Sequence, residues 1–278
     1  WFNRKGEKNG VSLAQLREDV RNLQAFFVHN GLAGKQIAIL GENCYEWLLV
    51  YFAAAYCGAI AVCVDIEQSD ETISQMLNMV DISAIFYASA FEHFRYSVSE
   101  ADVKKYLLAE RGEDKNVYSL IEEGKKLREN STSVIEAPVL PDMVASIVFT
   151  SGTTSSSKPV MLSQEAILTN ASDALANVAI GKTAFTSLPF YHTYGLTCSV
   201  LSMLIGKAHL FINGNLKTVM RDIHLAKPHT MLTVPLMLET IQKQIVSEMK
   251  RRKILLYPLN GLIVGFAALV LPERLERY

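Results

Sequence analysis

The segment from Ile147 to Lys158 contains the residue types in this chain most suited to holding a phosphorylated ligand. It reads Ile-Val-Phe-Thr-Ser-Gly-Thr-Thr-Ser-Ser-Ser-Lys, an apolar strand-like stretch followed by small polar residues and one lysine. Small residues let the backbone approach a ligand, and their O–H and N–H groups can donate hydrogen bonds to phosphate oxygens. The lysine adds a mobile positive charge. The pattern predicts a polyphosphate-binding loop, whereas composition alone favours a flexible polar linker.

Two better-known phosphate or nucleophile motifs do not fit this chain. Pro159 follows Lys158 where a Walker A loop needs Ser or Thr, and Ser157 stands where that loop has glycine. Gly181-Lys182-Thr183 lacks the leading glycine, since position 176 is alanine, so we interpret it as the end of a helix. A serine hydrolase is a weaker hypothesis because no G-x-S-x-G elbow is present.

Alternating helical and strand-like segments indicate how this loop is positioned. Short apolar strands joined by helices predict a mostly parallel sheet covered by helices on both faces, so the fold class is α/β. The predicted strands are 36–40, 59–64, 83–87, 145–149, 184–188, 209–212, 231–234 and 262–265. The predicted helices are 12–30, beginning with a capping-box spacing at Ser12, then 43–57, 69–80, 118–127, 164–179 and one starting near Pro272.

The composition changes to polar and charged between about residues 110 and 141. We interpret this stretch as the join between two stacked α/β subdomains, 1–140 and 141–278, the second beginning with the phosphate-binding loop. The chain starts with Trp1 and stops at Tyr278 inside a predicted helix. We therefore expect it to be the incomplete N-terminal part of a longer protein.

Charge and cysteine content bear on partners and compartment. The formal net charge is −1, from 27 basic and 28 acidic residues, which gives no reason to expect a nucleic-acid partner. The four cysteines have no metal-ligand spacing, so we expect buried, reduced thiols in a cytoplasmic protein. The uncharged run 47–64 is divided by Gly58 and predicts a buried helix followed by a strand rather than a transmembrane segment.

The run Thr150-Ser151-Gly152-Thr153-Thr154, with Lys158, resembles the phosphate-binding signature of the adenylate-forming superfamily. This superfamily includes acyl-CoA synthetases, aryl-CoA ligases, luciferases and the adenylation domains of peptide synthetases. Similar companions occur in the same order along the chain. They are Glu42-Asn43 with Glu46-Trp47, Leu188-Pro189-Phe190-Tyr191-His192-Thr193-Tyr194-Gly195, Lys227-Pro228, Val234-Pro235 and Gly265-Phe266-Ala267-Ala268-Leu269.

The resemblance implies an enzyme that uses ATP and Mg²⁺ to activate a carboxylate as acyl-AMP and then passes the acyl group to a thiol. Thr150, Ser151, Gly152, Thr153, Thr154 and Lys158 would hold the β- and γ-phosphates, with Thr150 touching Mg²⁺. His192 would lie beside the acyl pocket and help to position the carboxylate; without the motif it would be interpreted as a packed or surface histidine. Coenzyme A is the expected acceptor, and the Leu188–Gly195 motif favours a fatty acid.

Alternatives remain open at this stage. Ser155 and Ser157-Lys158-Pro159 depart from the glycine-rich pattern of the family, and serine does not supply positive φ as glycine does. A catalytically silent nucleotide-binding homologue is one alternative. An acyl-carrier-protein ligase or a peptide-synthetase adenylation domain is another. The adenine, ribose and catalytic-lysine motifs of the family are absent, so we expect these 278 residues alone to be inactive.

Overall fold

The structure is a computed structural model that describes residues 1–96, 103–109, 114–130, 137–150, 157–178 and 180–251. The chain divides into two compact units, Trp1–Leu232 and Thr233–Tyr278. Within the second unit the described element is helix α8, Pro235–Arg251. The predicted strand 262–265, the motif 265–269 and the helix predicted from Pro272 lie outside the described residues.

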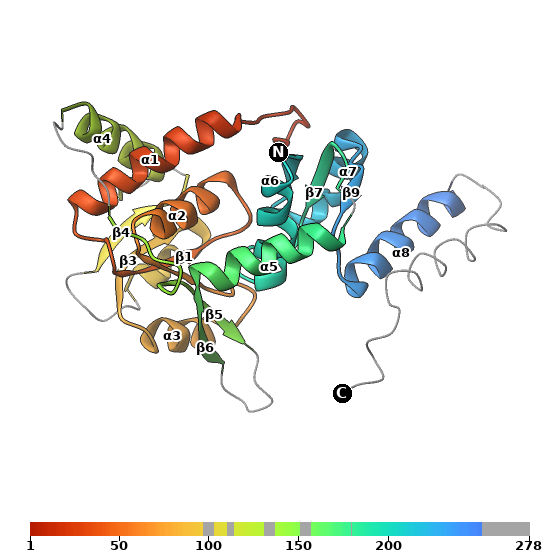
Figure 1. The fold of residues 1–278 in the computed structure, drawn as a ribbon. Coiled ribbons are helices and arrows are strands. Elements are labelled where there is room, and N and C mark those ends of the chain that lie inside the picture. The colour runs from red at the N-terminus through yellow and green to blue at the C-terminus, as the bar shows by residue number, and fades with distance from the viewer. Residues whose placement is uncertain (97–102, 110–113, 131–136, 151–156, 179, 252–278) are drawn as a thin grey trace. The chain divides into compact units, whose positions relative to one another are not determined.

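A six-stranded sheet forms the centre of the first unit (Figure 1). Its strand order is β4-β3-β1-β2-β5-β6, and all neighbours are parallel except β5 and β6. The strands are β1 (Gln36–Leu40), β2 (Ile60–Cys63), β3 (Ile82–Tyr87), β4 (Lys104–Leu107), β5 (Val144–Thr150) and β6 (Lys158–Ser163). Strands β5 and β6 thus join a sheet that is otherwise built from residues before 110.

Helices cover both faces of this sheet. Ile37 and Ile39 of β1 belong to one buried cluster, whereas Ala38 and Leu40 belong to another. Successive side chains of a strand point to opposite faces, so both faces are buried. Helices α1 (Leu13–His29), α2 (Tyr45–Tyr56) and α4 (Val117–Asn130) contribute to the first cluster, and α3 (Asp70–Asn78) with η1 (Ser89–Tyr96) contributes to the second. The α/β prediction is confirmed.

Serine caps fix the starts of several helices where the sequence predicts them. Ser12 Oγ accepts a hydrogen bond from the Gln15 amide at 3.1 Å. Ser163 Oγ accepts one from the Ala166 amide at 3.1 Å and so begins α5, Gln164–Asn177. Such caps satisfy amides that would otherwise lack partners in the first turn.

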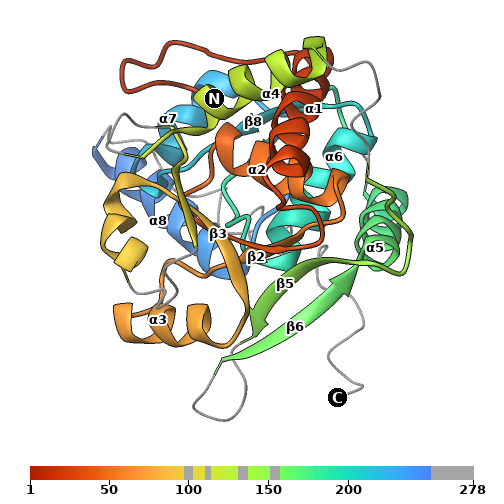
Figure 2. The same cartoon turned by 90° about the vertical axis from the view of Figure 1, so that its left-hand side faces the viewer.

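A smaller parallel sheet follows, with order β8-β7-β9. Its strands are β7 (Thr183–Thr186), β8 (His209–Ile212) and β9 (Thr230–Met231). Strand β9 ends earlier than the predicted strand 231–234. The connecting helices are the π-helix η2 (Tyr194–Leu201), α6 (Ser202–Ile205), the 3₁₀ turn η3 (Leu216–Thr218) and α7 (Val219–Ala226). Figure 2 shows the hairpin of β5 and β6 extending from the edge of the larger sheet.

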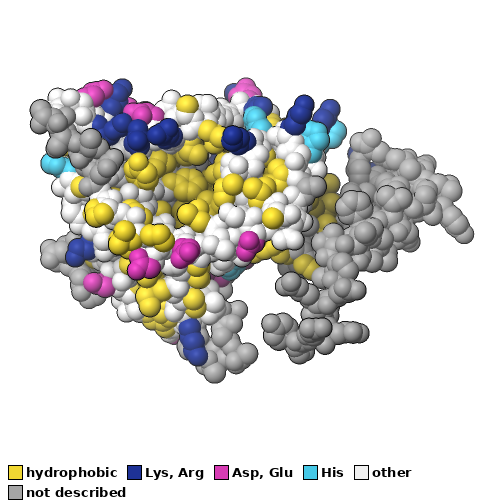
Figure 3. All heavy atoms as spheres, in the orientation of Figure 1, with side chains coloured by type: hydrophobic (Ala, Val, Ile, Leu, Met, Phe, Trp, Pro, Cys, Tyr) yellow, Lys and Arg dark blue, Asp and Glu magenta, His cyan; other side chains and the backbone are white. Residues whose placement is uncertain are grey.

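The uncharged run 47–64 forms α2 and β2, as predicted, and no helix among the described residues is long and apolar enough to cross a bilayer. All four cysteines are free; Cys57 and Cys63 are buried, whereas Cys44 and Cys198 are only partly so. Hydrophobic side chains gather on the face over α2 and α5 (Figure 3), and Tyr56 and Leu168 are among those exposed on these helices.

Candidate functional site

The hairpin of β5 and β6 carries both ends of the predicted phosphate-binding loop. Thr150 at the end of β5 and Lys158 at the start of β6 are direct partners across the strand pair. Both side chains are exposed. Because the two strands are antiparallel, the connecting residues begin and end at one place. Ser151, Gly152, Thr153 and Thr154, which the sequence assigns to phosphate binding, lie outside the described residues.

Strand β6 was not predicted, and it explains how the proline is accommodated. Pro159 pairs with Phe149 on an edge strand, where a residue without an N–H can be tolerated. Lys158 has the extended backbone that the following proline favours. The unusual Lys158-Pro159 sequence is therefore part of a regular strand.

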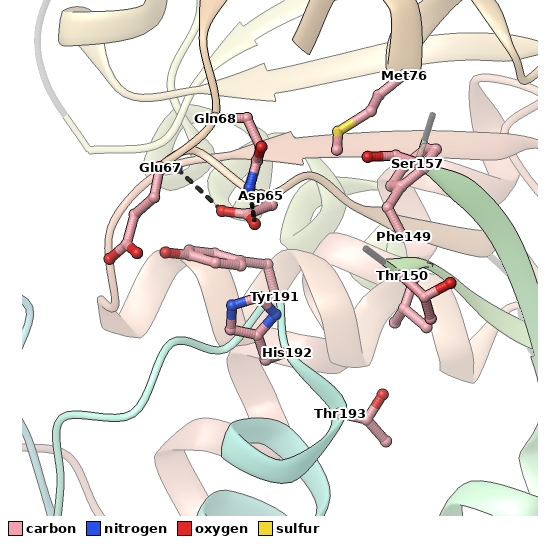
Figure 4. Close-up of a pocket in the computed structure, with 11 residues that line it drawn as sticks. Asp65, Glu67, Gln68, Met76, Phe149, Thr150, Ser157, Tyr191, His192 and Thr193 are labelled. Carbon is pink, nitrogen blue, oxygen red and sulfur yellow. Dashed lines mark hydrogen bonds between the residues drawn. The ribbon is translucent and has the colours of Figure 1, made fainter. Parts of the chain in front are cut away.

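A cavity of about 460 Å³ lies at the carboxyl ends of β2 and β5 (Figure 4). Ligands of open α/β sheets commonly bind at this edge. The cavity is lined by residues that follow β2, by the end of β5, by Ser157, by Met76 of α3 and by the loop that follows β7. These residues are Asp65, Glu67, Gln68, Met76, Val148, Phe149, Thr150, Ser157, Tyr191, His192 and Thr193.

The loop after β7 brings His192 to this cavity. His192 is exposed, whereas Tyr191 beside it is buried, and the centroids of their rings are 4.8 Å apart. A turn holds the loop, since the His192 amide donates to the Pro189 carbonyl oxygen at 3.3 Å. Figure 4 shows His192 beneath the Tyr191 ring, across the cavity from Ser157.

Carboxylates lie on the wall formed by the turn after β2. Asp65 is fixed there, because its Oδ1 accepts from the Glu67 amide at 3.0 Å and its Oδ2 accepts from Gln68 Nε2 at 2.8 Å (Figure 4). Burial, followed by the negative charges of Glu67 and Asp65, raises the pKa of the Tyr191 phenol far above its ordinary value. Tyr191 therefore stays neutral.

The two walls differ in what they can bind. Thr150 and Ser157 contribute hydroxyl groups on the hairpin side, and Asp65 and Glu67 contribute negative charge on the other. The hydroxyl groups can donate hydrogen bonds to an anionic ligand, whereas the carboxylates of the opposite wall would repel it.

The structure brings together two of the predicted site residues, Thr150 and His192, at one cavity. Lys158 adjoins it through its neighbour Ser157. Sequence reasoning missed Asp65, Glu67 and Gln68, which follow the predicted strand 59–64 and were assigned no role. Residues that follow neighbouring parallel strands lie at the same edge of the sheet. If the pairing of β2 with β5 had been known, this rule would have placed these three residues beside Thr150.

Comparisons with known proteins give similarities that extend over most of the chain. A family model described as AMP-binding enzyme matches residues 2–276. Probable acyl-activating enzyme 16, chloroplastic, from Arabidopsis thaliana is 28% identical over 250 residues, which cover 80% of this chain and 34% of that protein. Fatty acyl-CoA synthetase B from Dictyostelium discoideum is 23% identical over 282 residues, which cover 93% of this chain and 42% of that protein.

Among solved structures, o-succinylbenzoate CoA synthetase from Bacillus subtilis, in complex with its acyl-adenylate intermediate, has a TM-score of 0.68. It is 19% identical, and the match covers 86% of this chain and 46% of that one. At this identity the likeness supports the fold. The chain spans less than half the length of each of these three proteins.

Proposed function

The chain belongs to the AMP-binding enzyme family, and from that premise we propose that it activates a carboxylate with ATP. In the proposed reaction a carboxylate oxygen attacks the α-phosphorus, the bond from that phosphorus to the β-phosphate oxygen breaks, and pyrophosphate leaves. A thiolate then attacks the acyl carbon of the acyl-AMP, and AMP leaves. The cavity that places Thr150 and Ser157 across from His192 is the observation that supports this proposal most.

The hairpin side is the proposed phosphate site. The pairing of Thr150 with Lys158 gathers residues 151–157 into one connection. Their hydroxyl and amide groups, from Ser151, Gly152, Thr153 and Thr154, would donate to the β- and γ-phosphates, and Lys158 would add positive charge. The carboxylates of Asp65 and Glu67 would repel phosphate from the other wall and so orient the nucleotide.

Mg²⁺ fits this site as an ion carried with the nucleotide. Mg²⁺ usually takes one or two protein oxygens together with phosphates and water rather than an all-protein cage. The described residues contain no group of three or more His, Cys, Asp or Glu that could hold a metal, and the Thr150 hydroxyl is the ligand we assign. When bound, the ion would neutralise charge on the phosphates.

His192 is proposed to position the carboxylate. His192 lines the same cavity as Thr150 but lies in the loop that follows β7 of the smaller sheet, so it can act on the acid while the hairpin holds the phosphates. The carboxylate and the phosphates are both anions and repel each other. Holding them in line, with their charge neutralised, removes much of the barrier, so the reaction needs little covalent help from the protein.

The acid is proposed to be a fatty acid and the acceptor coenzyme A, as the name of the Dictyostelium relative suggests. An acyl carrier protein is the second candidate acceptor, and a peptide-synthetase-type amino-acid substrate is the competing class of acid. The four free cysteines fit a reducing compartment, for which we propose the cytoplasm. We also propose that the 278 residues by themselves do not complete the reaction.

Carboxylate-dependent exchange of labelled pyrophosphate into ATP tests the proposal. The natural protein containing residues 1–278 would be assayed with fatty, aryl and amino acids, and the 278-residue chain would be assayed beside it. Exchange with fatty acids alone is the expected result. Absence of exchange with every acid, from folded protein that binds ATP, would favour the silent nucleotide-binding homologue.

A further inference from the structure

Asn43, in the turn between β1 and α2, makes three hydrogen bonds to backbone groups of the smaller sheet and its loops. Its Nδ2 donates to the Leu188 carbonyl oxygen at 2.8 Å and to the Asn213 carbonyl oxygen at 3.3 Å. Its Oδ1 accepts from the Phe190 amide at 2.9 Å. One side chain thus connects the larger sheet to the segments that follow β7 and β8.

The main chain of Asn43 also packs closely against the smaller sheet's loops, at Gly214. A Cβ added at Gly214 would lie 2.3 Å from the Asn43 carbonyl oxygen, so only glycine fits against it. In the first turn of α2, the Trp47 ring meets the Phe190 ring edge-on with centroids 5.6 Å apart. Both aromatic side chains are almost completely buried. Phe190 is therefore held at its amide by Asn43 and at its ring by Trp47.

The segment that Asn43 holds leads directly into the cavity wall. Tyr191, His192 and Thr193 follow Phe190 without interruption and line the cavity. We infer that Asn43 is a positioning residue, which fixes the backbone of Leu188–Phe190 and thereby sets the place of His192 opposite the phosphate-binding hairpin. The role in the reaction rests on the proposed function, whereas the fixing of the loop does not.

Hydrogen exchange tests the fixing of the loop without reference to activity. The natural protein would be compared as wild type, Asn43→Ala and Asn78→Ala. Asn78 is a matched control, because its Nδ2 also donates to a backbone oxygen, that of Ser74 at 2.8 Å, and Asn78 lies on the exposed side of α3. Asn43→Ala should speed deuterium uptake in peptides covering 188–195 by about tenfold or more, since the amide of Phe190 loses its acceptor. Asn78→Ala should leave this uptake unchanged. Unchanged uptake in Asn43→Ala would overturn the inference.

A double-mutant cycle with His192 tests the positioning role. Asn43→Ala should lower the kcat of pyrophosphate exchange by about 10- to 100-fold and leave the KM for ATP unchanged, because the phosphate site is on the hairpin. In a His192→Ala background, Asn43→Ala should add less than about a twofold loss. Losses that multiply fully, or a parallel rise in the KM for ATP, would show a general structural role and overturn the inference.

Asn43→Asp provides a second variant if Asn43→Ala does not fold, since it has the same size and keeps the acceptor for the Phe190 amide. It should still raise uptake at 188–195, because the Leu188 and Asn213 carbonyl oxygens would lose their donor and face a carboxylate oxygen that repels them. If neither variant folds while Asn78→Ala does, the contacts support the whole fold and the inference is wrong. If the wild type shows no carboxylate-dependent exchange, the proposed function fails, and deuterium uptake still decides whether Asn43 fixes the loop.

Discussion

Replacing Gly195 with alanine would add a methyl group where the loop that carries His192 leaves no space. A Cβ at this position would lie 2.1 Å from the Pro189 carbonyl oxygen and 2.9 Å from the Pro189 carbonyl carbon. Real Cβ atoms essentially never come closer than 3.0 Å to another heavy atom. Both neighbours are backbone atoms, so no side-chain rotation relieves the clash. The backbone at 189 or at 195 must therefore move by roughly 0.9 Å, the gap between these distances.

Two opposing effects decide how Gly195→Ala changes the stability of the protein. Gly195 lies in η2, and in an unobstructed helix alanine is more favourable than glycine by about 1 kcal/mol. Forcing extra volume into a well-packed region instead costs about 1–3 kcal/mol. Because the clash is with backbone atoms, we expect its cost to exceed the gain and Gly195→Ala to lower the free energy of unfolding by up to about 2 kcal/mol. His192 lies between the two clashing positions, and a displacement of about 1 Å is enough to reduce a rate about 100-fold.

Thermal unfolding and pyrophosphate exchange would be measured for Gly195→Ala and for Gly10→Ala. Gly10 is a matched control because a Cβ there meets nothing within 4 Å. Gly195→Ala should lower both the Tm and the kcat, and Gly10→Ala should change neither. A Gly195→Ala variant that is more stable than the wild type and fully active would refute the geometry described for this loop.

Three further predictions concern the phosphate site, the acyl site and the core. Lys158→Ala should weaken ATP binding about 10- to 150-fold, equivalent to loss of a charged hydrogen bond of about 1.5–3 kcal/mol. Replacing Lys182, which is also exposed, with alanine should leave ATP binding unchanged. If calorimetry gives Lys158→Ala the same affinity for ATP as the wild type, Lys158 is not part of the site. His192→Ala should cut acyl-adenylate formation about 100-fold with ATP affinity retained, and an equal loss of both would indicate a folding role instead. Burial raises the pKa of the Cys63 thiol to about 12, so the unfolded chain releases this proton first and the free energy of unfolding should fall as pH rises above about 9. For this group the free energy of unfolding should fall by up to about 1.4 kcal/mol per pH unit. When that free energy is measured by urea unfolding between pH 9 and 11, it should fall less steeply with pH in Cys63→Ala than in the wild type. An equal dependence on pH in both proteins would contradict the argument.

The elements with strong local patterns could be predicted from the sequence. Strand β1 has its predicted bounds, 36–40, because an apolar run follows the Gly31–Gly34 turn. Helix α1 begins after Ser12, whose cap the sequence shows directly. The uncharged run 47–64 was divided correctly at Gly58, whose φ of 70° favours glycine.

Elements that depend on tertiary contacts could not be predicted. Strand β4 begins with two lysines, and β6 begins with Lys158-Pro159, so neither resembles a buried strand; both are edge strands. The π-helix Tyr194–Leu201 has no sequence pattern that distinguishes it from an α-helix. The predicted division of the chain into subdomains at residue 140 stays a prediction.

The site shows the same difference between local and long-range information. Thr150 and His192, which both line the cavity, could be singled out from the sequence because each lies in a motif with its own residue pattern. Asp65 and Glu67 were missed because they reach the cavity only through the pairing of β2 with β5. The three hydrogen bonds of Asn43 join residues far apart in the chain, so no local pattern reveals them.

The most direct test of the proposed chemistry follows one oxygen atom. The natural protein would be given a fatty acid labelled with ¹⁸O in both carboxylate positions, together with ATP and coenzyme A, and the products would be analysed by mass spectrometry. If the carboxylate attacks the α-phosphorus, the bridging oxygen stays with AMP when the thiolate takes the acyl group, so AMP should carry one ¹⁸O. Label in inorganic phosphate, with ADP as the nucleotide product, would show attack on the γ-phosphorus and contradict the account.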